Sequence, residues 1–156
     1  MFSMLSLAEP ERNADACLRK PALVLQHVKF RSISEETKKF EDWMLKTLED
    51  QKFVKSDIFA IVLALKEALD NAIKHGNQKN ENKNVEVLFT ITDKSFEAHI
   101  HDEGEPFDPT EIPDCTDPEN MERPSGRGVL LMRSYMSQVE FPPLGKPVML
   151  RKFWKR

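Results

Sequence analysis

Four polar side chains recur at the spacing of a helical face in the stretch EALDNAIKHG, residues 67–76. Glu67, Asn71, Lys74 and His75 lie at positions i, i+4, i+7 and i+8, and residues at this spacing share one side of an α-helix. A carboxylate on that side can take a proton from an attacking hydroxyl group, and an amide oxygen can bind Mg²⁺. The same residues also suit a solvated helix surface. His75, near the expected helix end, is left out of the site as a packing or dipole partner.

A second candidate, Asp102, continues an alternation of apolar and polar residues. Phe96, Ala98 and Ile100 share one face of a predicted strand, and the next step along that face is Asp102, followed by Gly104 in DEGEPFD. A carboxylate is costly to bury without a partner. A ligand with an exocyclic amine could therefore donate a hydrogen bond to Asp102. Taken alone, this aspartate also fits the start of a turn.

A third candidate is a pair of glycines in SGRGVLLM, where Gly126 and Gly128 flank Arg127. Glycines that open a helix let backbone N–H groups approach an anion, and the helix N-terminus favours negative charge. The pair predicts a site for phosphate groups. By itself it also fits an ordinary helix-entry turn, with Arg127 as a surface charge.

Together the three stretches predict a nucleotide site. The glycine pair would hold phosphates, Asp102 would accept a hydrogen bond from the base, Asn71 would bind Mg²⁺, and Glu67 would accept a proton. Neither of the common phosphate fingerprints, GxxxxGK[ST] and GxGxxG, occurs in the sequence. We therefore expect a different nucleotide-binding fold.

A small α/β fold is predicted to position these residues. One amphipathic helix begins at Ser34, and a second begins near Ser56 and Asp57 and ends at Gly76, with its polar side facing the site. Strands are predicted at 21–30, 85–91, 96–102, 137–141 and 147–154, with a proline-rich loop at 103–125 and a short helix after the glycine pair. Because short turns join consecutive strands, we expect a two-layer α/β sandwich. Its sheet is expected to be mixed and mostly antiparallel, with helices on one face.

Length and charge narrow the class of protein. The chain has 156 residues, of which 40% are hydrophobic and 31% charged, so we expect a flexible segment at 1–20 and a single domain at 21–156. The net charge of −3 argues against a nucleic-acid-binding surface, which needs basic residues. No apolar run approaches the roughly 18 residues of a membrane helix, and the two cysteines lack metal spacing. We expect a cytoplasmic protein that binds neither membranes nor nucleic acids.

Three of these stretches resemble the motifs of one protein family. EALDNAIKHG resembles the N box of the GHKL ATPases, which include gyrase, a heat-shock chaperone and the histidine kinases. DEGEPFD resembles their G1 box, and SGRGVLLM resembles their G2 box. In this order, and over 24–153, the set is most similar to the bacterial anti-sigma-factor serine kinases. The resemblance implies the Bergerat ATP-binding fold, with ATP and Mg²⁺ as cofactors.

The resemblance also implies a role for each matching residue. Glu67 would be the general base, Asn71 the Mg²⁺ ligand, and Asp102 the partner of the adenine amino group. Histidine kinases usually have asparagine at the position of Glu67, so the glutamate favours the serine kinases. The residues implied to contact the nucleotide are Asn71, Lys74, Asp102, Gly104, Phe107, Gly126, Arg127, Gly128, Val129 and Leu130.

One departure from the family pattern concerns the last strand. Members often begin it with Gly-Thr, whose hydroxyl supports the adenine-binding aspartate, but this chain has Gly145-Lys146-Pro147. We expect a weaker or water-mediated adenine network, which leaves the affinity for ATP open.

By resemblance, the chain would be an ATP- and Mg²⁺-dependent serine/threonine kinase that phosphorylates an anti-anti-sigma (STAS) protein, sequesters a sigma factor and forms a homodimer. Three alternatives stay open. The chain could be a regulatory module that binds ATP and sequesters a partner without phosphoryl transfer. It could be the catalytic fragment of a histidine kinase, although nothing in it resembles a phospho-accepting helical hairpin. It could also be a structural protein without a ligand.

Overall fold

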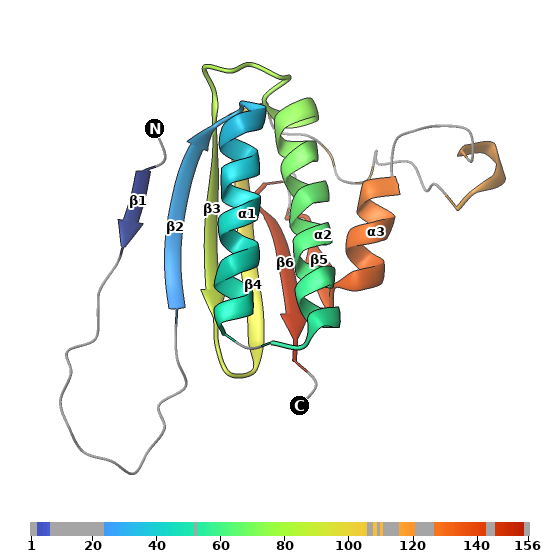
Figure 1. Cartoon of the computed structure of the whole chain (residues 1–156). Helices are drawn as coiled ribbons and strands as arrows, with labels where there is room; N and C mark the ends of the chain where they lie inside the picture. The colour runs from blue at the N-terminus through green and yellow to red at the C-terminus, as the bar shows by residue number, and fades with distance from the viewer. Residues whose placement is uncertain are drawn as a thin grey trace, which may run out of the picture.

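Strands and helices form two layers in the computed structural model (Figure 1), which describes residues 3–6, 24–51, 53–105, 108, 110, 116–120, 127–142 and 146–154. The α-helices are α1 (Ser34–Asp50), α2 (Lys55–Asn71) and α3 (Arg127–Tyr135). A π-helical turn, η1 (Ala72–Gly76), continues α2, and η3 (Pro118–Asn120) is a 3₁₀ turn. The strands are β1 (Ser3–Ser6), β2 (Val24–Arg31), β3 (Asn84–Ile91), β4 (Ser95–Asp102), β5 (Gln138–Glu140) and β6 (Val148–Phe153).

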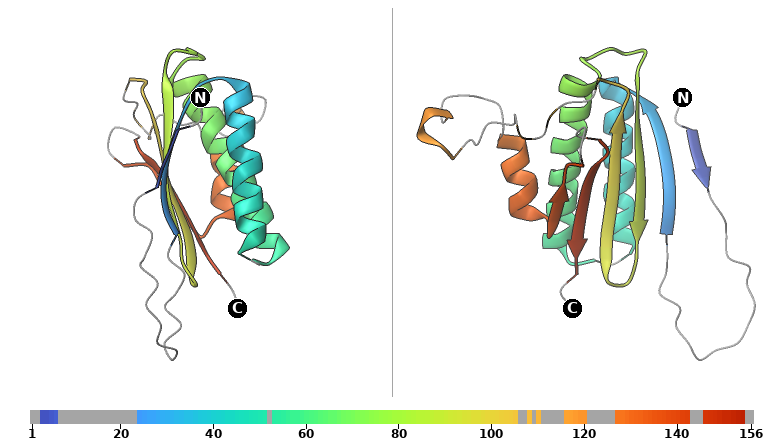
Figure 2. Two further views of the ribbon diagram at one scale, coloured as in Figure 1. Left: turned by 60° about the vertical axis from the view of Figure 1, so that its left-hand side comes forward. Right: turned by 180° about the vertical axis from the view of Figure 1, so that it is seen from behind.

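The six strands make one sheet with the order β1-β2-β3-β4-β6-β5, and every neighbouring pair in it is antiparallel. The helices cover one face of this sheet (Figure 2). The predicted two-layer α/β sandwich is therefore confirmed. Within the described residues the sheet has no parallel pair, so the expected mixed character is not seen there.

The core lies between the sheet and the helices. Alternate residues of β3 and β4 are buried, as their period-two pattern predicts. The helices contribute their apolar stripes, which include Phe40, Met44, Leu48, Ile61, Leu65 and Leu69. Asp102 is the last residue of the buried row on β4 and lies opposite Val85 of β3. The sheet thus brings this carboxylate to the edge of the core beneath the helices.

The segment β1 is an addition to the predicted elements, because residues 1–20 were expected to form only a flexible lead-in. Ser3–Ser6 pairs antiparallel with β2. Without it, β2 would be an edge strand with unpaired backbone groups, and a short added strand satisfies them. Four residues without a clear alternation give almost no sequence signal for such a strand.

The end of α2 departs from α-helical geometry. In η1 the Asn77 N–H donates to the Ala72 carbonyl at 2.7 Å, which is the i→i−5 bond of a π turn. Gly76 is the last residue of this turn, in line with the predicted helix end. The two residues after Asn77, Gln78 and Lys79, have positive φ angles of 53° and 58°, so the chain turns sharply towards β3.

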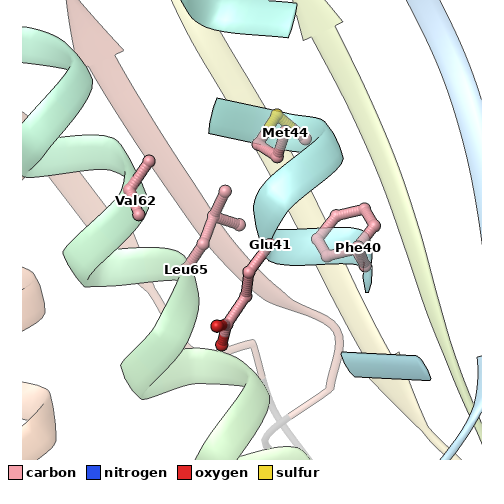
Figure 3. A pocket seen from close by; sticks show the side chains of 5 residues that line it. All are labelled: Phe40, Glu41, Met44, Val62 and Leu65. Atoms are coloured by element: carbon pink, nitrogen blue, oxygen red, sulfur yellow. The ribbon is translucent and has the colours of Figure 1, made fainter. Parts of the chain in front are cut away.

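The helices α1 and α2 meet along a narrow apolar seam lined by Phe40, Met44, Val62 and Leu65 (Figure 3). Glu41 also lies along this seam, and burial raises the pKa of its carboxyl group. The seam lies on the opposite side of α2 from the residues described next, which face α3.

Within the described residues, no helix has the length and apolar character needed to cross a membrane.

Candidate functional site

The first half of the candidate site lies between α2 and α3, which pack against each other (Figure 1). A Cβ atom added to Gly128 would lie 2.8 Å from Glu67 Oε2 and 3.8 Å from Asn71 Nδ2. Gly128 is in the first turn of α3, so the start of this helix faces the Glu67 carboxylate and the Asn71 amide. We call Glu67, Asn71 and Gly128 the α2–α3 site. The polar stripe that includes Glu67 and Asn71 is half-buried against a helix N-terminus.

Three other predicted phosphate-binding residues, Arg127, Val129 and Leu130, lie in the first turn of α3. Arg127 is exposed, Val129 is buried in the core, and Leu130 is 43% exposed. Gly126 and Phe107 lie outside the described residues. The backbone of the first turn of α3 is thus placed beside α2, and the individual roles of these residues stay predictions.

Lys74 lies on the exposed side of η1. Its ammonium group is 2.8 Å from Asp70 Oδ2, and about half of the side chain is exposed, at 51%. The hydrogen bond and the charge of Asp70 raise the pKa of Lys74. The structure therefore pairs Lys74 with Asp70 at the surface, and its contact with a phosphate stays a prediction.

The second half of the site surrounds Asp102. A Cβ atom on Gly76 would overlap the carboxylate of Asp102, and one on Gly104 would overlap the backbone carbonyl of Gly76. The Gly104 N–H donates to Asp102 Oδ1 at 2.8 Å. Two glycines therefore let the end of η1, the carboxylate and the turn after β4 lie in direct contact.

Lys146 completes this group, at the position where the family pattern has a hydroxyl residue. Its Nζ lies 2.8 Å from Asp102 Oδ1, and only 9% of the lysine and 10% of the aspartate side chain are exposed. Nζ also donates to the carbonyl of Gly104. We call Gly76, Asp102, Gly104 and Lys146 the Asp102 site. The missing hydroxyl is replaced by an ammonium group that makes an ion pair.

A buried asparagine ties the Asp102 site to the sheet. Asn77 is fully buried; its Nδ2 donates to Ser32 Oγ at 2.6 Å and to the Asn84 carbonyl at 2.8 Å, and its Oδ1 accepts from the Glu103 N–H at 2.8 Å. One side chain thus joins the ends of β2 and β4 to the start of β3. Asn77 holds the residue that follows Asp102.

A carboxylate on α1 supports the same end of the sheet. The Arg31 N–H donates to Glu36 Oε2 at 2.7 Å, and the Arg31 guanidinium donates to Oε1 at 2.8 and 3.0 Å. Burial alone would raise the pKa of Glu36, but these hydrogen bonds and the positive charge hold the pKa of this carboxyl well below its usual range. Arg31 lies opposite Asn84, so this pair braces the strand ends joined by Asn77.

The sequence predicts no site role for Asn77 or Lys146. Asn77 directly follows Gly76 at a helix end, where an asparagine suggests only a cap or a turn. Lys146 lies 44 residues from Asp102, and the missing Gly-Thr was the only sign that this position is unusual. A lysine next to a proline has no pattern that predicts a buried partner.

The chain matches one protein family across most of its length. The matching family is described as "Histidine kinase-like ATPase domain", and residues 31–152 align with it. The chain belongs to the histidine kinase-like ATPase domain family. All the described residues of the α2–α3 site and of the Asp102 site fall within the aligned range.

The chain is also similar to proteins named serine-protein kinase RsbW. It is 31% identical over 98 residues to one from Oceanobacillus iheyensis, and the alignment covers 58% of this chain and 62% of the relative. It is 32% identical over 108 residues to one from Staphylococcus epidermidis, and that alignment covers 64% of this chain and 68% of the relative. The match thus spans about two thirds of the length of these relatives.

Proposed function

We propose that this chain is an ATP- and Mg²⁺-dependent protein serine/threonine kinase that acts as an anti-sigma factor. The observation that carries the proposal is the close approach of Gly128, at the start of α3, to Glu67 and Asn71 of α2. It supports a site in which the N and G2 boxes act on one triphosphate. The names of the relatives, serine-protein kinases, support the same activity.

Each half of the site has its own task in this proposal. The carboxylate of Asp102 accepts a hydrogen bond from the adenine amino group, and the N–H groups in the first turn of α3 hold phosphate oxygens. Glu67 takes the proton of the attacking hydroxyl group, because it is the one carboxylate of the α2–α3 site. Phosphoryl transfer then depends mostly on positioning and on stabilisation of charge.

The residues of the α2–α3 site fit a magnesium ion. An amide and a carboxylate supply oxygen ligands of the kind that Mg²⁺ prefers, and the absence of a side chain at Gly128 lets the start of α3 lie directly against them. We propose Asn71 as the direct ligand. When bound, Mg²⁺ neutralises negative charge on the triphosphate.

The proposed protein substrate is the serine or threonine hydroxyl of a STAS-domain anti-anti-sigma protein, and the proposed sequestered partner is a sigma factor. Both proposals, and that of a homodimer, rest on the family resemblance. Transfer from labelled ATP to a candidate STAS protein tests the substrate. An acid-stable phosphoester on the STAS protein supports the serine kinase. An acid-labile phosphohistidine would instead favour a histidine kinase.

ATP binding by calorimetry, with and without Mg²⁺, tests the site itself. We expect the magnesium-dependent part of the affinity to disappear in Asn71→Ala, and Glu67→Gln, as the matched control, to bind ATP as the wild type does. Failure of the wild-type protein to bind ATP would refute the proposed function.

A regulatory module that binds ATP without transferring phosphate is the second candidate. The observation that favours it is the ion pair of Asp102 with Lys146, which already occupies part of the carboxylate proposed to bind adenine. The two candidates differ in one result. The module binds ATP and its protein partner, but Glu67→Gln leaves its behaviour unchanged.

A further inference from the structure

The ion pair between Lys146 and Asp102 is nearly buried. About nine tenths of each side chain is removed from solvent, and the two charged groups are 2.8 Å apart. Moving a lysine and an aspartate out of water is costly, and their attraction alone often fails to offset that cost. A pair of this kind at the proposed base-binding site therefore calls for a ligand-related explanation.

The hydrogen-bonding capacity of the pair is only partly used. Lys146 Nζ, which has three hydrogens, contacts Asp102 Oδ1 and the Gly104 carbonyl, while the Asp102 carbonyl lies farther away at 3.5 Å. Asp102 Oδ1 accepts from Lys146 and from the Gly104 N–H. Among the described residues, none donates to Asp102 Oδ2. An open acceptor on the carboxylate thus lies beside an ammonium group with a poorly satisfied N–H.

An acceptor next to a donor matches one edge of a nucleobase. On adenine, the exocyclic amino group donates and the adjacent ring nitrogen N1 accepts. We propose that Lys146 is a specificity-determining residue that donates a hydrogen bond to N1 of adenine, while Asp102 Oδ2 accepts from the amino group. This inference rests on the proposed ATP site and adds to it a second, charged contact with the base.

The ion pair has a purpose in this arrangement. Lys146 and the Gly104 N–H hold the carboxylate of Asp102 in place through Oδ1, so Oδ2 stays directed to the ligand. In return, Asp102 and the Gly104 carbonyl hold the ammonium group in one position. A hydroxyl residue at this position has a single hydrogen, which it would donate to Asp102, so no donor would remain for the base.

A nucleotide lacking the accepting nitrogen tests the proposal directly. In 1-deaza-ATP the ring N1 is replaced by C–H, and the amino group and triphosphate are kept. A hydrogen bond to a charged donor contributes enough that we expect wild-type protein to bind ATP about 10- to 100-fold more tightly than 1-deaza-ATP. In Lys146→Met this preference should fall to less than about threefold.

Two further variants control for folding and for general loss of charge. Lys146→Thr keeps a hydroxyl that can bond to Asp102, and we expect it to fold like the wild type and to lose the preference as well. Lys94→Met removes an exposed lysine from the turn between β3 and β4 and should keep the wild-type preference. Thermal melting of each variant reports whether it folds.

The possible results separate this inference from the proposed function. Equal wild-type affinity for the two nucleotides, or an unchanged preference in Lys146→Met and Lys146→Thr, would show that Lys146 only supports Asp102 and would overturn the inference alone. Tighter binding of ATP by the two variants would make Lys146 a competitor of the base, which also overturns it. A wild-type protein that binds neither nucleotide would overturn the inference and the proposed ATP site together.

Discussion

The α2–α3 site and the Asp102 site hold their polar groups by different means. At the α2–α3 site, a Cβ atom added to Gly128 would first meet the carboxylate oxygen at the end of the Glu67 side chain, which can rotate away. At the Asp102 site, Gly104 lies against the backbone of Gly76, and the carboxylate of Asp102 is fixed by an ion pair and a backbone N–H. The first half is thus formed by the ends of side chains, and the second is fixed by backbone contacts and an ion pair.

This difference corresponds to the two proposed tasks. A group that transfers a proton has to approach and leave its substrate, so Glu67 needs some freedom. Groups that bind a base keep one arrangement throughout, and a fixed arrangement lowers the entropic cost of binding. The halves also differ in sequence, because the α2–α3 site follows the family pattern and the Asp102 site departs from it at Lys146.

The largest expected effect is on catalysis at the α2–α3 site. Replacement Glu67→Gln should lower the rate of phosphoryl transfer by about 10²- to 10⁴-fold, because a general base contributes on that scale. Affinity for ATP and thermal stability should stay close to wild type. The transfer rate to a STAS protein, measured with saturating ATP, checks this prediction. Full activity in Glu67→Gln would show that Glu67 is not the general base, and the α2–α3 site would then not be the catalytic half.

Adding one methyl group should destabilise the protein much more at the Asp102 site than at the α2–α3 site. Gly104→Ala places a Cβ against the backbone of Gly76 and should lower the free energy of unfolding by about 3 kcal/mol, since neither segment can move easily. Gly128→Ala meets the mobile end of Glu67, and alanine suits a helix better than glycine, so stability should change by less than about 1 kcal/mol.

Transfer activity completes the comparison of the two alanine variants. Gly128→Ala displaces the Glu67 carboxylate and should lower the rate by about 10²-fold. Urea unfolding and the transfer assay measure the two quantities separately. Equal loss of stability in both variants would contradict the division into a rigid and a mobile half.

Removing the buried amide of Asn77 should loosen the Asp102 site without touching the α2–α3 site. Asn77→Ala removes the hydrogen bonds of the Asn77 amide with Ser32 Oγ, the Asn84 carbonyl and the Glu103 N–H, so the free energy of unfolding should fall by about 2 kcal/mol. Asn80→Ala, an exposed neighbour, is the control and should change stability by less than about 0.5 kcal/mol. Urea unfolding of both variants checks the prediction, and similar values for the two would show that Asn77 is not the link.

The smallest expected effect depends on pH. The pKa of Glu36 is lowered in the folded protein, so its ion pair stabilises the fold fully above the pKa of an unfolded glutamate, and this contribution disappears as the pH falls through the folded pKa. Glu36→Gln should cost about 1 kcal/mol at pH 7.

The measurement is urea unfolding of Glu36→Gln and wild type at several pH values. The difference between the two proteins should narrow steadily below about pH 4.5, where an unfolded glutamate becomes protonated. Glu35→Gln, an exposed control paired with Lys39, should follow the wild-type curve closely. A difference that stays constant with pH would show that the Glu36 charge is not involved.

The helices and central strands could be predicted because local patterns determine them. The alternation in β3 and β4 and the stripe in α1 reflect burial of single faces, and those periods are visible in the sequence. The strand β1 could not be predicted, because it is short and forms only through pairing with β2. The shape of η1 was also not visible, since a π turn has no pattern of its own.

The candidate site divides in the same way. Glu67, Asn71 and Asp102 stand out because they are polar at positions where the periodic pattern predicts partial burial. Gly128 stands out because it is a glycine at a predicted helix start. Lys146 acquires its role only from a partner on a different strand. Phe107 and Gly126 lie outside the described residues, and their predicted contacts stay predictions.

The number of residues in the π turn η1 determines how the two halves of the site are oriented to each other. Asn71 faces α3 at one end of this turn, and Gly76 meets Asp102 at the other. Each residue of an α-helix advances the chain by about 100° around the axis. Losing or gaining one residue in Ala72–Gly76 would rotate one half away while the other stayed in place. The number of residues in this segment is therefore as constrained as the glycine at its end, because the length sets the angle between the proposed triphosphate and base sites.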